Sequence, residues 1–200
     1  MNKLHVLYVP GLGDHDLTKQ SNMLVFWKWW NVETEIFQMN WADDVAWKKK
    51  FNALLKRIDG LYAKGEKIAL VGISAGGSAV INAYAARPNK IVGVACIAGK
   101  INQPEKIGPR YHNRNPSFVE SAKNSPLSVD KLTEAQRSKI LSRYGVFDPL
   151  VSKTDSRVPG ARNRLSPTIG HVMTIAYQIT IGAPSLLHFL KKQMKDQTKA

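Results

Sequence analysis

A serine, an aspartate and a histidine, far apart in the chain, have the residue types that nucleophilic catalysis requires. Ser74 lies in the pentapeptide Gly-Ile-Ser-Ala-Gly at residues 72–76, directly after the apolar run 68–71. A serine hydroxyl becomes a strong nucleophile only when a base removes its proton and a carboxylate orients that base. Asp148 and His171 follow Ser74 in that order along the chain. These three residues are therefore the candidate nucleophile, acid and base.

Secondary structure must bring these residues together, and the sequence alternates between strand and helix patterns. Short apolar runs predict strands at Leu4–Val9, Val32–Phe37, Ile68–Ile73, Ile91–Ala98, Lys139–Tyr144 and, more weakly, Ala161–Leu165. Helical spacing and capping residues predict helices at about 14–30, 43–64, 78–87, 130–138 and 184–194. Such alternation is typical of a parallel sheet with helices on both faces. We predict an α/β fold with a mostly parallel sheet of about six strands.

Each candidate residue follows the end of a predicted strand. Ligands bind in open α/β sheets at the carboxyl ends of parallel strands, so Ser74, Asp148 and His171 are expected at one edge of the sheet. Asp155 lies later in the same loop as Asp148 and is the alternative acid. His188, between apolar neighbours in the last predicted helix, is expected to be a packed helix histidine.

The Gly-x-Ser-x-Gly pattern at a strand–turn–helix boundary is typical of a nucleophile elbow. In an elbow the serine has a strained backbone, and its hydroxyl projects above the edge of the sheet. Gly72 and Gly76 are expected to let neighbouring backbone pass without a Cβ clash, and Gly77 to ease packing of the helix start. The N–H of Ala75 is expected to point to the place where an oxyanion would form.

At these motifs the chain resembles the α/β-hydrolase superfamily, in particular its small, single-domain serine hydrolases. The resemblance covers nearly the whole chain and depends on the elbow, the Gly-Val-Phe-Asp turn at 145–148 and the Gly-His turn at 170–171. It implies the α/β-hydrolase fold, with Ser74 as nucleophile, Asp148 as acid and His171 as base. The first antiparallel strands of the larger family members are missing from the predicted element order.

The same resemblance implies a second oxyanion donor and an activity. Pro10-Gly11-Leu12-Gly13 lies where the family commonly has His-Gly-x-Gly, which implies the N–H of Leu12 as that donor, although proline replaces the histidine. The implied activity is hydrolysis of a carboxylic ester or thioester, a small-molecule acyl substrate, through an acyl-enzyme on Ser74. The alternatives are acyl transfer or carbon–carbon bond hydrolysis on the same triad, and a non-catalytic binding protein with this fold.

Residues 100–130 contain several prolines and glycines with little periodicity, which predicts a loop or small cap on a single domain that spans residues 1–200. Loops of this kind over the sheet edge supply contacts to a substrate. The candidate substrate-binding residues are Gly11, His15, Tyr111 and His112.

The composition describes an ordinary globular protein of 200 residues, 44% hydrophobic and 22% charged. The sequence has no apolar run long enough to span a bilayer. Cys96 is the only cysteine, so no intramolecular disulfide can form, and a reducing, cytoplasmic location is the simplest expectation.

The net charge of +14 is the unusual global feature. Its basic residues are spread along the chain without a nucleic-acid motif, so we expect no nucleic-acid partner. The aromatic stretch Phe26–Trp30 leaves peripheral membrane contact open, with packing of a helix on the sheet as the first interpretation. Metal-ligand spacing, a dinucleotide fingerprint and a Walker lysine are all missing, so we expect neither a metal nor a cofactor.

Overall fold

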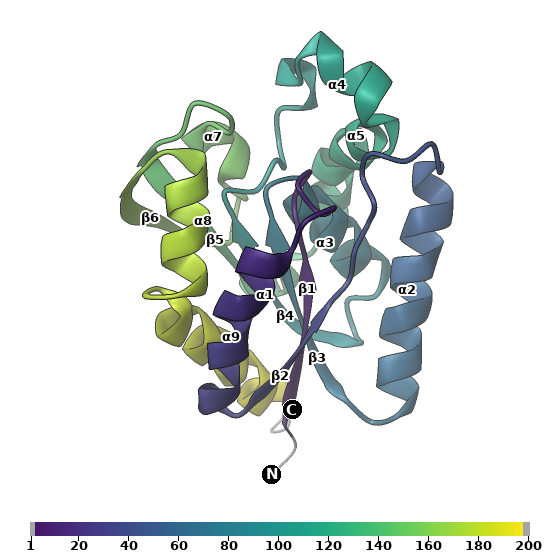
Figure 1. The fold of residues 1–200 in the computed structure, drawn as a ribbon. Helices are drawn as coiled ribbons and strands as arrows, with labels where there is room; N and C mark the ends of the chain where they lie inside the picture. Colours follow the sequence, from purple (N-terminus) through teal and green to yellow (C-terminus); the bar gives the residue numbers. More distant parts are fainter. Residues whose placement is uncertain (1–2, 198–200) are drawn as a thin grey trace.

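Six parallel strands form the centre of the computed structural model, which describes residues 3–197 (Figure 1). Their bounds are β1 Leu4–Val9, β2 Val32–Ile36, β3 Lys67–Ile73, β4 Ile91–Ile97, β5 Ile140–Phe147 and β6 Arg162–Ile169. The strands lie in the order β2-β1-β3-β4-β5-β6, and each neighbouring pair is parallel. The predicted α/β class with a mostly parallel sheet is confirmed.

Helices cover both faces of this sheet (Figure 1). One face carries α2 (Trp47–Ala63), α3 (Ala75–Ala86) and α5 (Pro116–Lys131). The other carries α1 (Thr18–Leu24), the 3₁₀ helix η1 (Val25–Trp30), α8 (His171–Ile179) and α9 (Ala183–Gln197). The short helices are η2 (Pro104–Lys106), α4 (Pro109–Arg114), α6 (Glu134–Arg137) and α7 (Lys153–Ser156). Between residues 3 and 197 no helix is both long and apolar enough to cross a membrane.

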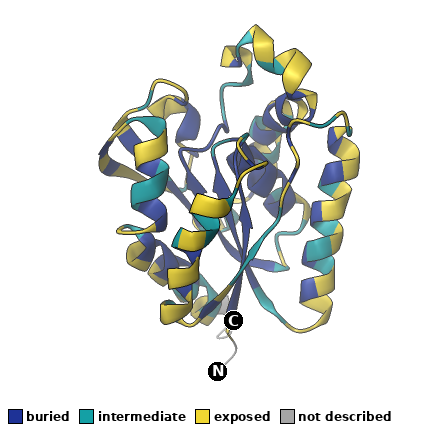
Figure 2. Cartoon of the chain, in the orientation of Figure 1, coloured by how far each residue is buried: buried dark blue, intermediate teal, exposed yellow. Residues whose placement is uncertain are grey.

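The central strands are apolar because helices cover both of their faces. Every residue of β1 and β4 is buried, and the middle of the sheet is dark blue in Figure 2. In the edge strand β6, by contrast, only Ser166 and Thr168 are buried. This exposure explains why the sequence signal for β6 is weak and why the predicted segment ends at Leu165, four residues too early.

Residues 100–130 differ most from the prediction, because they are mostly helical. Here η2 and α4 lead into the 16-residue α5, which packs against α3. The buried face of α5 includes Ser117, Ser121 and Ser125, so hydrophobic residues alone show no helical period. Ser121 compensates for its burial by a hydrogen bond, with its Oγ 2.8 Å from Oγ of Ser78 on α3.

Two further helices also differ from the prediction. The helix expected at about 130–138 is interrupted, because α5 ends at Lys131 and the Thr133 side chain caps the four-residue α6. The helix α8 was not predicted at all. Val172, Ile175, Ala176 and Ile179 have the i, i+3, i+4, i+7 spacing of one helix face, so the signal for this helix was present in the sequence.

Candidate active site

Ser74 lies between the end of β3 and the start of α3, and its backbone is strained. Its φ of 51° and ψ of −114° fall in a region that residues other than glycine rarely adopt. Three hydrogen bonds hold this conformation. The Ser74 N–H donates to the carbonyl of Ile97 at 3.0 Å, and the Ser74 carbonyl accepts from the N–H groups of Gly77 and Lys100, each at 3.0 Å. The strain that an elbow requires is therefore present at this serine.

The glycines on either side of Ser74 lie where the backbone leaves no room for a side chain. A Cβ on Gly72 would lie 2.4 Å from the carbonyl oxygen of Gly76. A Cβ on Gly76 would lie 2.1 Å from the carbonyl oxygen of Val9, at the end of β1. Contacts this short are repulsive, so both positions need glycine for the close approach of β1, β3 and α3.

The loop after β1 lies directly against Ser74. A Cβ on Gly11 would be 3.0 Å from Cβ of Ser74 and 3.6 Å from its Oγ. The backbone N–H groups of Leu12 and Ala75 donate no hydrogen bond to any group in residues 3–197. Ala75 is also the first residue of α3, where the helix dipole favours negative charge. Both N–H groups are free to stabilise an anion beside the serine.

A buried carboxylate orients His171. Asp148 comes directly after β5 and His171 begins α8 just after β6, with 2.7 Å between His171 Nδ1 and Asp148 Oδ2. Asp148 Oδ1 accepts from the backbone N–H groups of Leu150 at 2.8 Å and Val151 at 3.0 Å. Burial acts to raise the pKa of Asp148, but the bonds from His171 and from these N–H groups outweigh it and lower that pKa. Asp148 is therefore a carboxylate at neutral pH, and Nδ1 of His171 donates to it.

Asp155, the alternative acid, has a different set of partners. Its Oδ1 accepts from the backbone N–H groups of Ile101 at 2.9 Å, Asn102 at 2.8 Å and Gln103 at 3.0 Å. Its Oδ2 pairs with the buried Lys100 ammonium group. The structure thus pairs His171 with Asp148 and uses Asp155 to hold the segment after β4.

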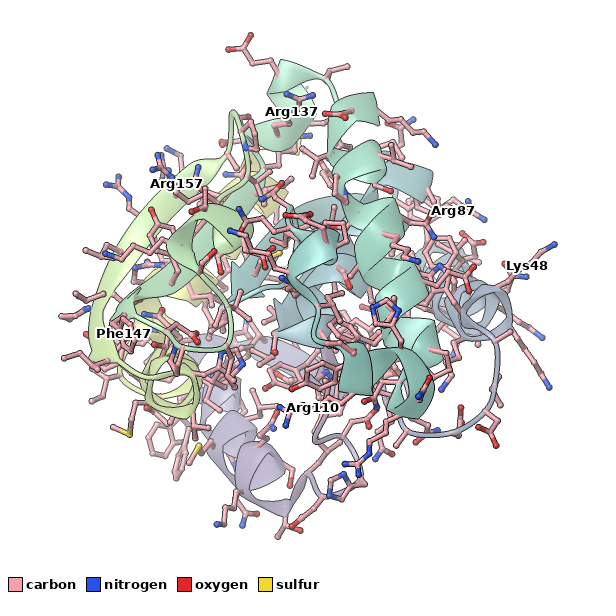
Figure 3. All side chains as sticks on the ribbon, turned by 90° about the horizontal axis from the view of Figure 1, so that it is seen from above. Lys48, Arg87, Arg110, Arg137, Phe147 and Arg157 are labelled. Carbon is pink, nitrogen blue, oxygen red and sulfur yellow. The ribbon has the colours of Figure 1, made fainter. Side chains whose placement is uncertain are left out.

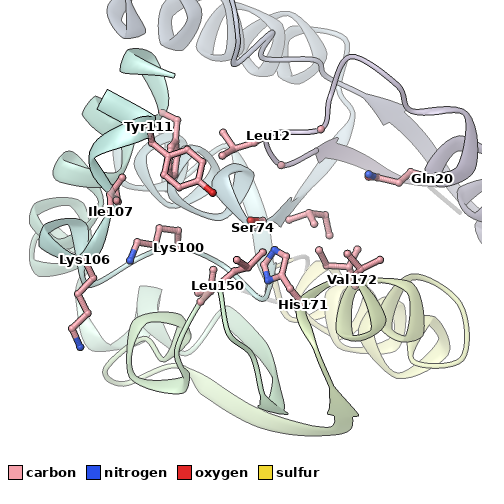
Figure 4. A pocket seen from close by; sticks show the side chains of 17 residues that line it. Leu12, Gln20, Ser74, Lys100, Lys106, Ile107, Tyr111, Leu150, His171 and Val172 are labelled. Carbon is pink, nitrogen blue, oxygen red and sulfur yellow. The ribbon is translucent and has the colours of Figure 1, made fainter. Parts of the chain in front are cut away.

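Ser74 and His171 lie side by side in a cavity of about 300 Å³ at the carboxyl ends of the strands (Figure 4). In residues 3–197 no hydrogen bond joins the Ser74 hydroxyl to the imidazole. The apolar walls come from three loops and from α4, α5 and α8, and are formed by Leu12, Ile107, Tyr111, Phe118, Leu150, Val151, Val172 and Ile175. The described residues contain no group of three or more His, Cys, Asp or Glu side chains that could hold a metal ion.

Comparisons with known proteins identify the fold. No family model matches the sequence, and no curated protein is detectably similar to it. Among solved structures it is similar to Est1E from Butyrivibrio proteoclasticus, with a TM-score of 0.72 and 17% identity over 97% of this chain and 89% of that chain. The chain has the α/β-hydrolase fold. A structure from work on carboxylesterases of Nitrososphaera gargenis has a TM-score of 0.70 and 14% identity, over 97% of this chain and 92% of that chain. Mouse alpha/beta hydrolase domain-containing protein 10 has a TM-score of 0.65 and 16% identity, over 94% of this chain and 90% of that chain.

Within this α/β-hydrolase fold, two of the candidate substrate-binding residues line the cavity and two do not. Gly11 and Tyr111 are part of its wall. His15 and His112 are exposed and do not line it. His112 follows Tyr111 in α4, and neighbouring helix residues point in directions about 100° apart, so only one of them faces the serine.

Several residues of the cavity wall were not predicted from the sequence. Lys100 lies just after β4, so the rule that sites form at the carboxyl ends of strands could have identified it. Ile107 and Phe118 belong to the segment interpreted as a loop, and Val172 and Ile175 to the unpredicted helix α8. The apolar spacing of Val172, Ile175 and Ile179 could have identified α8, whereas no sequence pattern pointed to Ile107 or Phe118.

Proposed function

We propose that the chain is a serine hydrolase that cleaves carboxylic esters or thioesters through an acyl-enzyme on Ser74. The observation that carries the proposal is the strained Ser74 in a cavity beside His171, whose Nδ1 lies 2.7 Å from a buried carboxylate. Carboxylesterases of Nitrososphaera gargenis and a monoacylglycerol lipase from Paleococcus ferrophilus are among the proteins with similar structures, which supports the same chemistry. We keep the cytoplasm as the proposed location because of the lone cysteine, and cell fractionation tests it.

The reaction starts with attack on the substrate carbonyl. The Ser74 oxygen forms a bond to the carbonyl carbon while Nε2 of His171 takes the hydroxyl proton. The carbonyl oxygen becomes an oxyanion, for which the free N–H groups of Leu12 and Ala75 are the donors. When the tetrahedral intermediate collapses, the bond to the alcohol or thiol breaks, and the leaving group takes the proton from His171.

A water molecule then repeats the sequence on the acyl-enzyme. His171 takes a proton from the water, and the resulting hydroxide attacks the ester carbon of the acylated Ser74. Collapse of the second intermediate breaks the bond to the serine oxygen, which regains its proton from His171. The products are a carboxylic acid and the free enzyme. Asp148 keeps Nδ1 protonated throughout and stabilises the imidazolium that forms in each half-reaction.

The shape of the cavity supports small substrates with an apolar acyl group. Its volume of about 300 Å³ is at the lower end of the range for small-molecule sites. Tyr111 and Phe118, whose rings pack edge to face with centroids 6.1 Å apart, close one side. We expect short- and medium-chain esters to be cleaved faster than long-chain esters.

Covalent labelling with a fluorophosphonate probe tests the proposal. The wild-type protein should be labelled at one site, and Ser74→Ala should lose both the label and ester hydrolysis, with kcat lower by roughly 10⁴–10⁶. Ser138→Ala, which changes an exposed serine outside the cavity, should behave like the wild type. Folded wild-type protein that stays unlabelled at high probe concentration would favour a non-catalytic binding protein instead.

A further inference from the structure

A second depression, away from Ser74, lies between the edge of the sheet and the last helix. We call it the basic groove. It has a volume of about 420 Å³ and shares no residue with the wall of the catalytic cavity. Its residues come from β5, β6 and α9 and are Leu141, Arg143, Arg162, Arg164, Ser185, His188, Phe189 and Lys192. His188, expected to be packed inside the helix layer, is exposed here.

The strand register places the arginines of the basic groove on one face. Arg143 on β5 lies opposite Arg164 on β6, and Leu141 lies opposite Arg162. Side chains two residues apart in a strand point to the same side, so all three guanidinium groups lie on the face that α9 partly covers. The helix adds Lys192 to the same groove.

The positive charges of the basic groove have no carboxylate partner. In residues 3–197, Arg143, Arg162, Arg164 and Lys192 form no ion pair. Elsewhere in the chain arginines do pair, as Arg87 does with a carboxylate at 2.9 Å. Like charges directly opposite each other in a sheet are destabilising, so the Arg143–Arg164 pair costs stability when the groove is empty.

Arg143 also has an unused, buried donor. One of its terminal nitrogens donates to Oγ of Ser185 at 2.6 Å, but its Nε is buried and has no hydrogen-bond partner. Burial, followed by the charge of Arg164, lowers the pKa of Arg143. Arg162 contacts α9, because its guanidinium carbon lies 5.5 Å from the centroid of the Phe189 ring. These contacts distinguish Arg143 and Arg162 from fully solvated surface arginines.

We propose that the basic groove binds a phosphate-bearing anion. A phosphate group would accept hydrogen bonds from the guanidinium groups of Arg143 and Arg164, which line the groove, and it would screen their repulsion. Lys192 would supply a further charge from the helix side. The phosphate comes either from a soluble metabolite-sized compound or from a phospholipid headgroup, and the experiment separates these two sources.

The first arm measures binding of inorganic pyrophosphate by isothermal titration calorimetry. The double substitution Arg143→Gln and Arg164→Gln should weaken binding by about tenfold or more, because charge-assisted hydrogen bonds are lost. The control is Lys48→Gln with Lys49→Gln on α2, which removes the same two charges from exposed positions. Lys48 lies on the side of the molecule opposite Phe147 and Arg157 (Figure 3), so this control should bind like the wild type.

The second arm measures binding to phosphatidylcholine vesicles with and without phosphatidylglycerol. Loss of vesicle binding in the groove variant, with no pyrophosphate binding by the wild type, identifies a lipid headgroup as the source. If the double variant does not fold, the single variant Arg164→Gln, at an exposed position, should also weaken binding of the probe that the wild type binds. Equal weakening by the groove and control variants in both arms would show attraction to net charge only and overturn the proposal, as would a wild type that binds neither probe.

Discussion

The two halves of the candidate active site are held by different means. Around Ser74, backbone contacts make the structure: a positive φ and glycines whose Cβ positions lie within 2.4 Å of neighbouring carbonyl oxygens. Around His171, side-chain hydrogen bonds make it, with Asp148 and two backbone N–H groups as the partners. A side chain added in the first half would displace β1 or α3. In the second half, a side chain can lose its charge without a change in the path of the backbone.

This difference predicts which substitutions lower both stability and activity and which lower mainly activity. A substitution in the backbone-held half should lower stability and activity together, because the same contacts support the core. A substitution in the half held by side chains should lower activity with little loss of stability. The two aspartates of the β5–β6 connection provide the sharpest comparison, since one faces His171 and the other faces Lys100.

The largest effect is expected from Asp148→Asn. An amide cannot hold the imidazole in the tautomer that accepts the serine proton, so kcat should fall by roughly 10⁴. The melting temperature should fall by only about 2–4 °C, which corresponds to about 1 kcal/mol. Ester hydrolysis and thermal unfolding of the same preparation measure the two quantities.

The matched control for that prediction is Asp155→Asn. It breaks a buried ion pair with Lys100 and weakens three bonds to backbone N–H groups, so the free energy of unfolding should fall by about 3–5 kcal/mol. Below its melting temperature the variant should keep much of its kcat. A larger loss of kcat in Asp155→Asn than in Asp148→Asn would reverse the assignment of the acid.

The next effect tests the backbone-held half through Gly76→Ala. The added Cβ would lie 2.1 Å from the carbonyl oxygen of Val9 and 2.7 Å from that of Pro10. Moving β1 away from α3 should cost about 3 kcal/mol, the upper end for overpacking, and lower the melting temperature by about 6–12 °C. Ester hydrolysis should fall as well, because the loop that carries Leu12 moves with β1.

Gly13→Ala is the control for this steric argument. A Cβ on Gly13 would meet no atom within 4 Å, and its φ is not in the left-handed region, so stability should stay within about 0.5 kcal/mol of the wild type. If Gly76→Ala and Gly13→Ala unfold at the same temperature, the close approach of β1 and α3 does not limit stability.

The sequence predicts the backbone-held half well because its determinants are local. Gly72, Ser74 and Gly76 lie within five residues at the end of an apolar strand, so the motif is visible in one short stretch, although the carbonyl oxygen that excludes a side chain at Gly76 belongs to Val9 on β1. For the acid, the sequence favours Asp148 and leaves Asp155, later in the same loop, as the alternative. Choosing between them needs their side-chain partners His171 and Lys100, which are 23 and 55 residues away in the chain.

The helical structure of residues 100–130 could not be predicted from the sequence, for a physical reason. The longest helix of this segment, α5, buries three serines, of which Ser121 bonds to α3, so hydrophobic residues mark only part of its buried face. The basic groove cannot be recognised in the sequence either, because only the β5–β6 register brings Arg143 beside Arg164.

A smaller effect is expected where α4 meets the cavity. Tyr111→Ala removes a wall residue and its contact with Phe118, so KM for a short-chain ester should rise by about tenfold with little change in kcat. Longer acyl chains should become relatively better substrates because the cavity is wider. His112→Ala, one residue further along α4 and outside the cavity, should leave both constants unchanged. Equal changes in the two variants would mean that α4 acts through its fold alone.

The smallest effect concerns stability at acid pH and also separates the two halves. The pKa of Asp148 is lowered in the folded protein, so the carboxylate adds stability above the pKa of the unfolded chain, about 3.9. That contribution is lost as the pH falls through the lower, folded pKa. The difference in melting temperature between the wild type and Asp148→Asn should therefore be constant from pH 7 to about 5 and close below about 4.

A control variant shows whether this closing gap belongs to the His171–Asp148 pair. Asp44→Asn removes an exposed carboxylate that forms no ion pair in residues 3–197, so its melting curve should follow the wild type at every pH. Gly76→Ala, by contrast, should stay less stable than the wild type by the same amount throughout, because a steric clash does not titrate. A gap for Asp148→Asn that stays open at pH 3 would mean that the amide disturbs packing, and that this half of the site also depends on shape.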